Sequence, residues 1–217
     1  MPLGELTWAI ILAKQTLWEF LSWEVVPERQ AEVIGELDLL QKLNVGVVHN
    51  PQSNMKLASG VAPVPEMLKR DMRLGLGTDG AASNNDLNMW EEMDTAAKLH
   101  KVFASDPKVV SAQQAFEMAT IRGARALHLE HEIGSIEAGK RADLVIVDRE
   151  DLNQIPAYNV YSDLVYATKA WDVLTVIING QIVMLDRKLL TLDEAAIKEG
   201  ARTYRARVLE SLGKGDH

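Results

Sequence analysis

The sequence predicts an α/β fold built on parallel strands, and three observations support this class. Two short apolar runs, Val45–Val48 and Leu74–Gly77, contain no alternating polar side chains, as is typical of parallel strands covered on both faces. A helical segment separates them, so the three elements form a βαβ unit with a right-handed crossover. After Gly134 the apolar residues recur at strand spacing, and Asn179-Gly180 is a strong hairpin signal because both turn positions need positive φ.

The composition is that of an ordinary globular chain and argues against several functions. The 217 residues are 47% apolar and 25% charged, and they carry a net charge of −8 without any cluster of Lys or Arg. We therefore expect no nucleic-acid partner, because phosphates require a basic surface. The absence of cysteine excludes a disulfide framework and a thiolate metal site, and it fits a cytoplasmic location.

Residues 1–35 form a separate segment rich in tryptophan. Trp8, Trp18 and Trp23 lie there, among apolar residues that recur at helical spacing. Charged side chains interrupt its longest apolar stretch, which is too short to span a membrane, so we expect no membrane partner. An amphipathic helix that packs on a neighbour is the simplest interpretation, and it predicts a homo-oligomer.

Short helices are predicted around the two parallel strands. Glu36–Leu43 has helical spacing, and Asn44 supplies the left-handed residue that ends the helix. A loop over residues 49–62 is expected to follow the first strand. The helix after this loop is predicted from two prolines at its start and two arginines near its end: Pro63, Pro65, Arg70 and Arg73.

Two longer helices are predicted after the second strand. Asp86 is placed to cap the first of them. The buried face of this helix is predicted from residues at helical spacing: Met89, Met93, Ala96, His100 and Phe103. Ser111 and Gln114 form a capping box for the second helix. Its predicted apolar face comprises Phe116, Ala119 and Leu127.

The last part of the chain predicts antiparallel strands and a final helix. The predicted strands are Ala142–Val147, Leu174–Ile178 and Gln181–Met184. We expect them to pair with one another and not to extend the parallel pair. Thr191 with Glu194 makes a capping box that predicts the start of a C-terminal helix.

Two polar segments, His49–Lys56 and Thr78–Asn85, directly follow the predicted parallel strands. Neighbouring parallel strands end at the same edge of a sheet, so the Cα atoms of His49 and Asp79 are expected within roughly 10 Å of each other, with both side chains facing one cavity. A carboxylate at a strand end can bind a divalent metal and accept a proton from metal-bound water. Spacing alone also allows Asp79 to be a turn residue and His49 to be a hydrogen-bonded core histidine.

Longer stretches of sequence resemble a known family. They are His-Asn-Pro-Gln-Ser-Asn-Met-Lys from His49, Leu-Gly-Thr-Asp-Gly-Ala-Ala-Ser-Asn-Asn from Leu76, and the run Ile133–Val147. They resemble the amidohydrolase superfamily, in particular its 5′-methylthioadenosine/S-adenosylhomocysteine deaminases and related chlorohydrolases. The resemblance covers Glu36 to Arg187.

This resemblance implies the C-terminal part of a metal-dependent (β/α)8 barrel, namely its last two strands and the following helices. A portion of a small β-sandwich and a C-terminal helix complete the implied architecture. The predicted division is an atypical N-terminal helical segment (1–35), a partial barrel (36–132), the sandwich portion (133–190) and the C-terminal helix (191–217).

The resemblance also implies a site. Asp79 resembles the aspartate that ends the eighth strand, which is both a metal ligand and the catalytic residue that moves a proton from the attacking water to the leaving amine. His49 resembles the strand-seven histidine that faces the substrate, with Asn50 and Ser83 near the ribose or the attacking water. The implied cofactor is a divalent metal, zinc or iron. The implied reaction is hydrolytic deamination of an adenosine-type purine nucleoside, which is the expected small-molecule partner.

The other metal ligands of the family are absent from this sequence. Besides His49, its histidines are His100 on an apolar helical face, His128 and His131 in a predicted surface loop, and the terminal His217. None forms a His-x-His pair, whereas zinc in a catalytic site uses three protein ligands, and a complete barrel takes about 250 residues. We therefore expect a truncated, frameshifted or separately completed enzyme that does not bind the metal alone. A catalytic hydrolase lineage and a non-catalytic fragment or oligomerising module both stay open.

Overall fold

The computed structural model describes residues 30–150 and 152–213, which group into two units. The first unit contains the residues through Arg141 together with Arg149–Asp172, and the second contains Ala142–Asp148 and the residues from Val173 onward. Residues 149–172, predicted as part of the sandwich portion, group with the first unit, and the predicted domain limits themselves stay predictions. The predicted tryptophan-rich helix lies outside the described residues.

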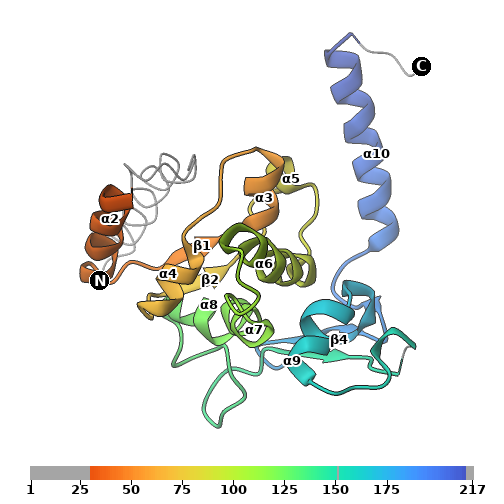
Figure 1. The fold of residues 1–217 in the computed structure, drawn as a ribbon. Coiled ribbons are helices and arrows are strands. Elements are labelled where there is room, and N and C mark those ends of the chain that lie inside the picture. The colour runs from red at the N-terminus through yellow and green to blue at the C-terminus, as the bar shows by residue number, and fades with distance from the viewer. Residues whose placement is uncertain (1–29, 151, 214–217) are drawn as a thin grey trace. The chain divides into compact units, whose positions relative to one another are not determined.

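The predicted parallel strand pair is confirmed in the first unit (Figure 1). Strand β1 (Val47–His49) pairs with β2 (Leu74–Leu76) in parallel register, with His49 opposite Leu76. Both strands are shorter than predicted. Val45 lies in the turn after the preceding helix and not in the strand, because its N–H donates back to the carbonyl of Leu40 at 3.0 Å.

Helix α2 (Gln30–Lys42) precedes β1, and it begins before the predicted Glu36. Asn44 follows it with φ of 54°, which confirms the predicted left-handed residue. The predicted loop after β1 was wrong in part, because it contains helix α3 (Pro51–Lys56), which starts at a proline in its first position. A helix of this length is too short to show a helical pattern in the sequence.

The second crossover helix, α4 (Val64–Lys69), ends earlier than predicted. Asp71 has φ of 49°, and the N–H of Met72 donates to the carbonyl of Met67, so the chain turns directly after Arg70. Arg73 therefore stands in front of β2 and not in the last turn of the helix. Its guanidinium instead forms an ion pair with Glu130 at 2.9 Å.

Four helices lie between β2 and β3: α5 (Ala81–Asn84), α6 (Met89–Ala104), α7 (Ala112–Ala119) and α8 (Ile121–Ala126). The predicted cap of α6 was wrong, because Asn88 and not Asp86 accepts the N–H of Trp90. The capping box of Ser111 and Gln114 on α7 is confirmed.

The single helix predicted from Ser111 to Leu127 is two helices. They are separated at Thr120, whose φ of −126° and ψ of −105° are not helical. Leu127 lies beyond α8 and is 53% exposed, so it does not belong to the apolar face that the sequence predicted.

The core of the first unit lies between the parallel pair and its helices. Buried apolar side chains from β1, β2, α4, α6 and α7 form one cluster that includes Val47, Leu74, Met67, Met93 and Met118. Helix α8 packs against β2. This packing brings the backbones close together, because a Cβ on Gly75 would lie 2.9 Å from the Cα of Gly123.

Several short helical turns between β3 and β4 belong to the first unit: η2 (Leu152–Gln154), α9 (Val160–Ser162), η3 (Asp163–Ala167) and η4 (Ala170–Asp172). The second unit is an antiparallel sheet in the order β3-β4-β5-β6. Its strands are β3 (Leu144–Val147), β4 (Val173–Ile178), β5 (Gln181–Leu185) and β6 (Lys188–Leu189). Their mutual pairing is as predicted. The Asn179-Gly180 turn between β4 and β5 is also confirmed, with φ of 51° and 78°.

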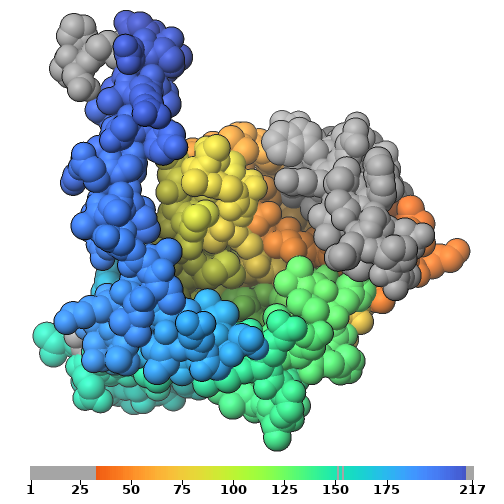
Figure 2. Space-filling view, turned by 180° about the vertical axis from the view of Figure 1, so that it is seen from behind, coloured from red at the N-terminus to blue at the C-terminus, as the bar shows by residue number. Residues whose placement is uncertain are grey.

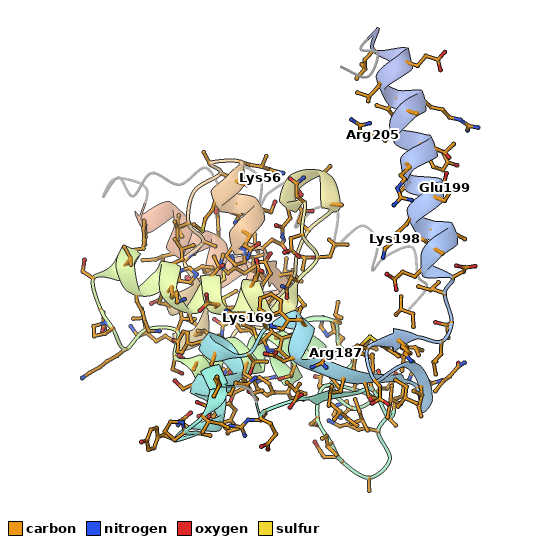
Figure 3. All side chains as sticks on the ribbon, turned by 90° about the vertical axis from the view of Figure 1, so that its right-hand side faces the viewer. Lys56, Lys169, Arg187, Lys198, Glu199 and Arg205 are labelled. Atoms are coloured by element: carbon orange, nitrogen blue, oxygen red, sulfur yellow. The ribbon has the colours of Figure 1, made fainter. Side chains whose placement is uncertain are left out.

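Helix α10 (Glu194–Ser211) ends the described chain. The predicted cap was wrong, because the side chain of Asp193 and not of Thr191 accepts the N–H of Ala196 at 3.0 Å. Ion pairs between side chains one turn apart join Lys198 to Glu194 and Arg202 to Glu199, and Lys198 and Glu199 are labelled in Figure 3. In the part of the chain that the structure describes, every helix is too short or too polar to cross a bilayer.

Candidate functional site

Asp79 lies three residues beyond the end of β2 and is the centre of a polar cluster. Its backbone is left-handed, with φ of 57°, which an Asp tolerates better than most residues. Its Oδ2 accepts hydrogen bonds from the hydroxyl of Ser53 at 2.9 Å and from that of Ser83 at 2.7 Å. Ser53 comes from α3 after β1, and Ser83 comes from α5 after β2. The carboxylate therefore joins the two segments that follow the parallel strands.

Asn50 also reaches Asp79, but through the backbone. Its Oδ1 accepts the N–H of Asp79 at 3.2 Å. Gly77 leaves room for this contact, since a Cβ at that position would lie 2.6 Å from Oδ1 of Asn50 and 2.7 Å from Cγ1 of Val48. A side chain at position 77 would push the Asn50 amide away from Asp79.

His49 contacts His100, a residue outside the polar cluster around Asp79. It is 3% exposed, and its Nε2 lies 3.1 Å from Nε2 of His100, which is fully buried in α6. Side chains alternate along a strand, so His49 shares the face of β1 that bears Val47, a member of the core cluster. The structure thus places His49 beside His100, whereas it places Ser53 and Ser83 beside the carboxylate of Asp79.

Both imidazoles of this pair are neutral at physiological pH. Burial, and then repulsion from His100, lowers the pKa of His49 to about 3. Burial, and then the charge of Lys101, lowers the pKa of His100 to about 4. One ring must therefore donate its Nε2–H to the Nε2 lone pair of the other. The Nδ1 atoms of both rings have no hydrogen-bond partner among the described residues.

Glu92, in the first turn of α6, is a buried acid that the sequence did not single out. It is 0% exposed, and its two oxygens accept hydrogen bonds from helix α3 after β1 and helix α5 after β2. Oε2 accepts the backbone N–H of Gln52 at 3.2 Å, and Oε1 accepts Nδ2 of Asn84 at 2.6 Å. Burial raises the pKa of the Glu92 carboxyl, and these two donors oppose the rise.

One signal in the sequence points to Glu92. Glu92, Ala96 and His100 are spaced four residues apart on α6 and therefore lie on one face of the helix. All three are buried. An acid on a buried helical face requires hydrogen-bond donors from elsewhere in the fold, and the sequence does not show where these donors are.

The segment around Asp79 lies at the surface of the first unit. Asp79, Gly80, Ala81 and Ala82 are exposed, and this part of the chain is yellow in the space-filling view (Figure 2). Lys56, labelled in Figure 3, donates from α3 to the carbonyl of Ala82 at 3.3 Å and also bonds the side chain of Asn85. The charged amine of Lys56 is thus held beside the exposed segment that contains Asp79.

The described residues do not build a complete metal site. No group of three His, Cys, Asp or Glu side chains within residues 30–150 and 152–213 could hold a metal ion. Asp79 can supply one carboxylate ligand, whereas a catalytic zinc ion takes three protein ligands. His128 and His131 are exposed, and His217 lies outside the described residues.

This architecture places the chain among α/β proteins whose polar residues gather at the carboxyl ends of parallel strands, as in barrel hydrolases. Comparison with known proteins identifies the family. Residues 13–183 match the model of the amidohydrolase family, so the chain belongs to this family.

Its relatives include several deaminases. The chain is 51% identical over 177 residues to the 5-methylthioadenosine/S-adenosylhomocysteine deaminase of Desulforudis audaxviator, covering 82% of this chain and 41% of the relative. It is 46% identical over 168 residues to the 5'-deoxyadenosine deaminase of Methanobrevibacter smithii, covering 77% and 39% of the two chains.

A solved structure agrees with these relatives. The crystal structure of an adenosine deaminase from Xanthomonas campestris with bound zinc matches with a TM-score of 0.78 and 44% identity, covering 80% of this chain and 40% of that one. The chain thus spans about two-fifths of the length of the proteins it matches.

Proposed function

We propose that this chain belongs to an enzyme that removes the C6 amino group of an adenosine-type nucleoside by hydrolysis, and that Asp79 is its catalytic carboxylate. The main support is the 51% identity to a 5-methylthioadenosine/S-adenosylhomocysteine deaminase over a region that contains Asp79 and its serine donors. An amidohydrolase acts on C–N bonds, and deamination is one such reaction.

Asp79 is suited to proton transfer. Its carboxylate is exposed at a strand end, and the hydroxyls of Ser53 and Ser83 fix one oxygen by donating to Oδ2. In the proposed reaction, Asp79 accepts a proton from the attacking water and delivers it to the leaving amine, which departs as ammonia. Asn50 and Ser83 are proposed to lie near the substrate, as is His49, whose contact with His100 orients its ring.

A divalent metal is the proposed cofactor of the complete site. The family and the zinc in the related adenosine deaminase structure support it. When bound, such a metal activates water for attack. Asp79 is the proposed ligand from this part of the chain, and the remaining ligands would come from residues outside those described here.

The chain by itself is expected to show no appreciable deaminase activity and no zinc binding of ordinary affinity. The physical reason is the ligand count, since one carboxylate without imidazole partners is a weak zinc site. Incubation with adenosine-type nucleosides and added zinc, followed through the change in ultraviolet absorbance of the purine, measures this. Turnover that disappears in Asp79→Asn would contradict the prediction.

A chimera tests the proposed function directly. The matched 177 residues of this chain would replace the corresponding part of the Desulforudis audaxviator deaminase, which supplies the rest of the enzyme. We expect the chimera to deaminate adenosine-type nucleosides, and Asp79→Asn to lower the rate by roughly 10²- to 10⁴-fold. Asp86→Asn makes the same chemical change seven residues away and is the matched control.

The outcome of this experiment separates the two interpretations that the sequence leaves open, a catalytic hydrolase lineage and a non-catalytic fragment or oligomerising module. A folded chimera that releases ammonia, and depends on Asp79 but not on Asp86, supports a catalytic lineage. A folded, metal-loaded chimera that does not act on these nucleosides would refute the proposed function and favour a non-catalytic role for this chain.

A further inference from the structure

We propose that Glu92 is a positioning residue that holds Asp79 in place by joining helix α3 after β1 to helix α5 after β2. The inference deepens the proposed function and rests on it, because the position of Asp79 matters for catalysis only if Asp79 takes part in the chemistry. Glu92 does not touch the carboxylate of Asp79 in any described contact. It acts through the residues on either side of the cluster.

The first connection runs through α3. Oε2 of Glu92 accepts the backbone N–H of Gln52 at 3.2 Å. The next residue, Ser53, is buried and donates its hydroxyl to Oδ2 of Asp79 at 2.9 Å. Glu92 therefore fixes the first turn of α3 at the residue next to the Asp79 donor.

The second connection runs through α5. Oε1 of Glu92 accepts Nδ2 of Asn84 at 2.6 Å, and the same amide donates to the carbonyl of Thr78 at 2.8 Å. Thr78 directly precedes Asp79, which holds a left-handed φ of 57°. The amide of Asn84 therefore ties the backbone beside Asp79 to the buried acid of α6.

A carboxylate is the only side chain of this size that can make both connections at once. Both partners are donors, and only a carboxylate has two acceptor oxygens at the same reach. A glutamine at position 92 would accept from one partner and direct its own NH2 group at the other. If Asn84 turned over to accept that NH2 group, it would lose its bond to Thr78.

The buried charge itself favours this interpretation. A buried acid is costly unless donors compensate it, and Glu92 is 0% exposed. Its place in the first turn of α6 gives further compensation from the helix N-terminus. Glu91 occupies the same turn, but it reaches only side chains, Nε2 of Gln52 at 3.5 Å and Nδ2 of Asn88 at 3.2 Å. Glu91 therefore provides a matched control for the loss of charge.

Amide hydrogen exchange on the full 217-residue chain tests the proposal without any substrate or metal. We expect Glu92→Gln to speed exchange at the amides of Gln52 and Asp79 by about 10- to 100-fold, because one buried donor loses its acceptor. Glu91→Gln should leave both amides unchanged. The amide of Gln114, held by the capping box of α7, should exchange at its original rate in both variants.

Asn84→Ala provides a second and milder variant in case Glu92→Gln does not fold. It removes only the α5 connection, so exchange should rise at Asp79 and stay unchanged at Gln52. In the chimera, Glu92→Gln should lower kcat about tenfold and leave KM close to its original value, since Asp79 acts in the chemical step.

Three results would overturn the proposal. They are unchanged exchange at Gln52 and Asp79 in Glu92→Gln, an equal rise at Gln114, and an equal effect of Glu91→Gln. A folded, metal-loaded chimera without activity would refute the proposed function without altering the exchange result, so the two failures are distinguishable.

Discussion

Acidification is expected to destabilise the first unit through the buried His49–His100 pair. Both side chains are almost fully buried, and their pKa values are lowered to about 3 and about 4 from an ordinary value of 6.5. In the unfolded chain both imidazoles become protonated below pH 6.5, whereas in the folded chain they stay neutral down to about pH 4. Their contribution to stability is therefore complete above the unfolded pKa and is lost as the pH falls.

The magnitude follows from the same values. Between pH 7 and pH 5, each histidine is expected to reduce the free energy of unfolding by about 2 kcal/mol, and the pair by about 4 kcal/mol. Glu92 acts in the opposite sense, because its pKa is raised in the folded state. The carboxyls whose pKa is lowered by ion pairs, such as Glu66, lose their contribution only below this pH range.

Urea unfolding at several pH values between 7 and 5 measures this loss, and a variant isolates the histidines. His100→Gln removes one titrating ring and keeps an amide that can bond His49, so it should reduce the loss by about half. His128→Gln changes an exposed histidine outside the buried pair and is the matched control for the substitution itself. Stability that is constant from pH 7 to pH 5, or equal slopes for the original chain and His100→Gln, would refute the reasoning.

Three further substitutions test the packing, the interior of α2 and the cap of α7. Gly46→Ala would place a Cβ 1.8 Å from the carbonyl oxygen of Ala126, so it should lower the free energy of unfolding by about 3 kcal/mol. Gly35→Ala in α2 would place a Cβ with no atom within 4 Å, so it should raise the free energy of unfolding by about 0.5–1 kcal/mol. Equal stabilities in urea unfolding would contradict this. Ser111→Ala removes the cap of α7 and should cost about 1 kcal/mol, and an unchanged midpoint would show that the cap is not needed.

Elements with a strong local signal could be predicted from the sequence. The apolar runs before His49 and Thr78 predicted two parallel strands, and Ser111 with Gln114 predicted the start of α7. The Asn179-Gly180 turn was predicted because its conformation depends on the two residues themselves. The family could also be predicted, since the stretches around His49 and Asp79 carry it without reference to the rest of the fold.

Local choices between near-equivalent residues were predicted less well. Asp86 and Asn88 can each cap a helix, as can Thr191 and Asp193, and in both cases the structure uses the second residue. Capping energies differ little between these residue types, so the position of the helix decides which of them is used. The break at Thr120 has the same origin, because a continuous helical pattern does not show where the backbone must turn.

The sequence by itself determined the α/β class, the two polar segments after the parallel strands and the presence of Asp79 in one of them. Only the tertiary structure decided which residues meet there. It brought Ser53 to Asp79 across 26 positions and Glu92 to Gln52 across 40. It also joined His49 to His100 across 51 positions. Secondary structure depends on neighbours a few residues apart, whereas a buried polar side chain must find its partner wherever the chain folds back, and no local pattern encodes that distance.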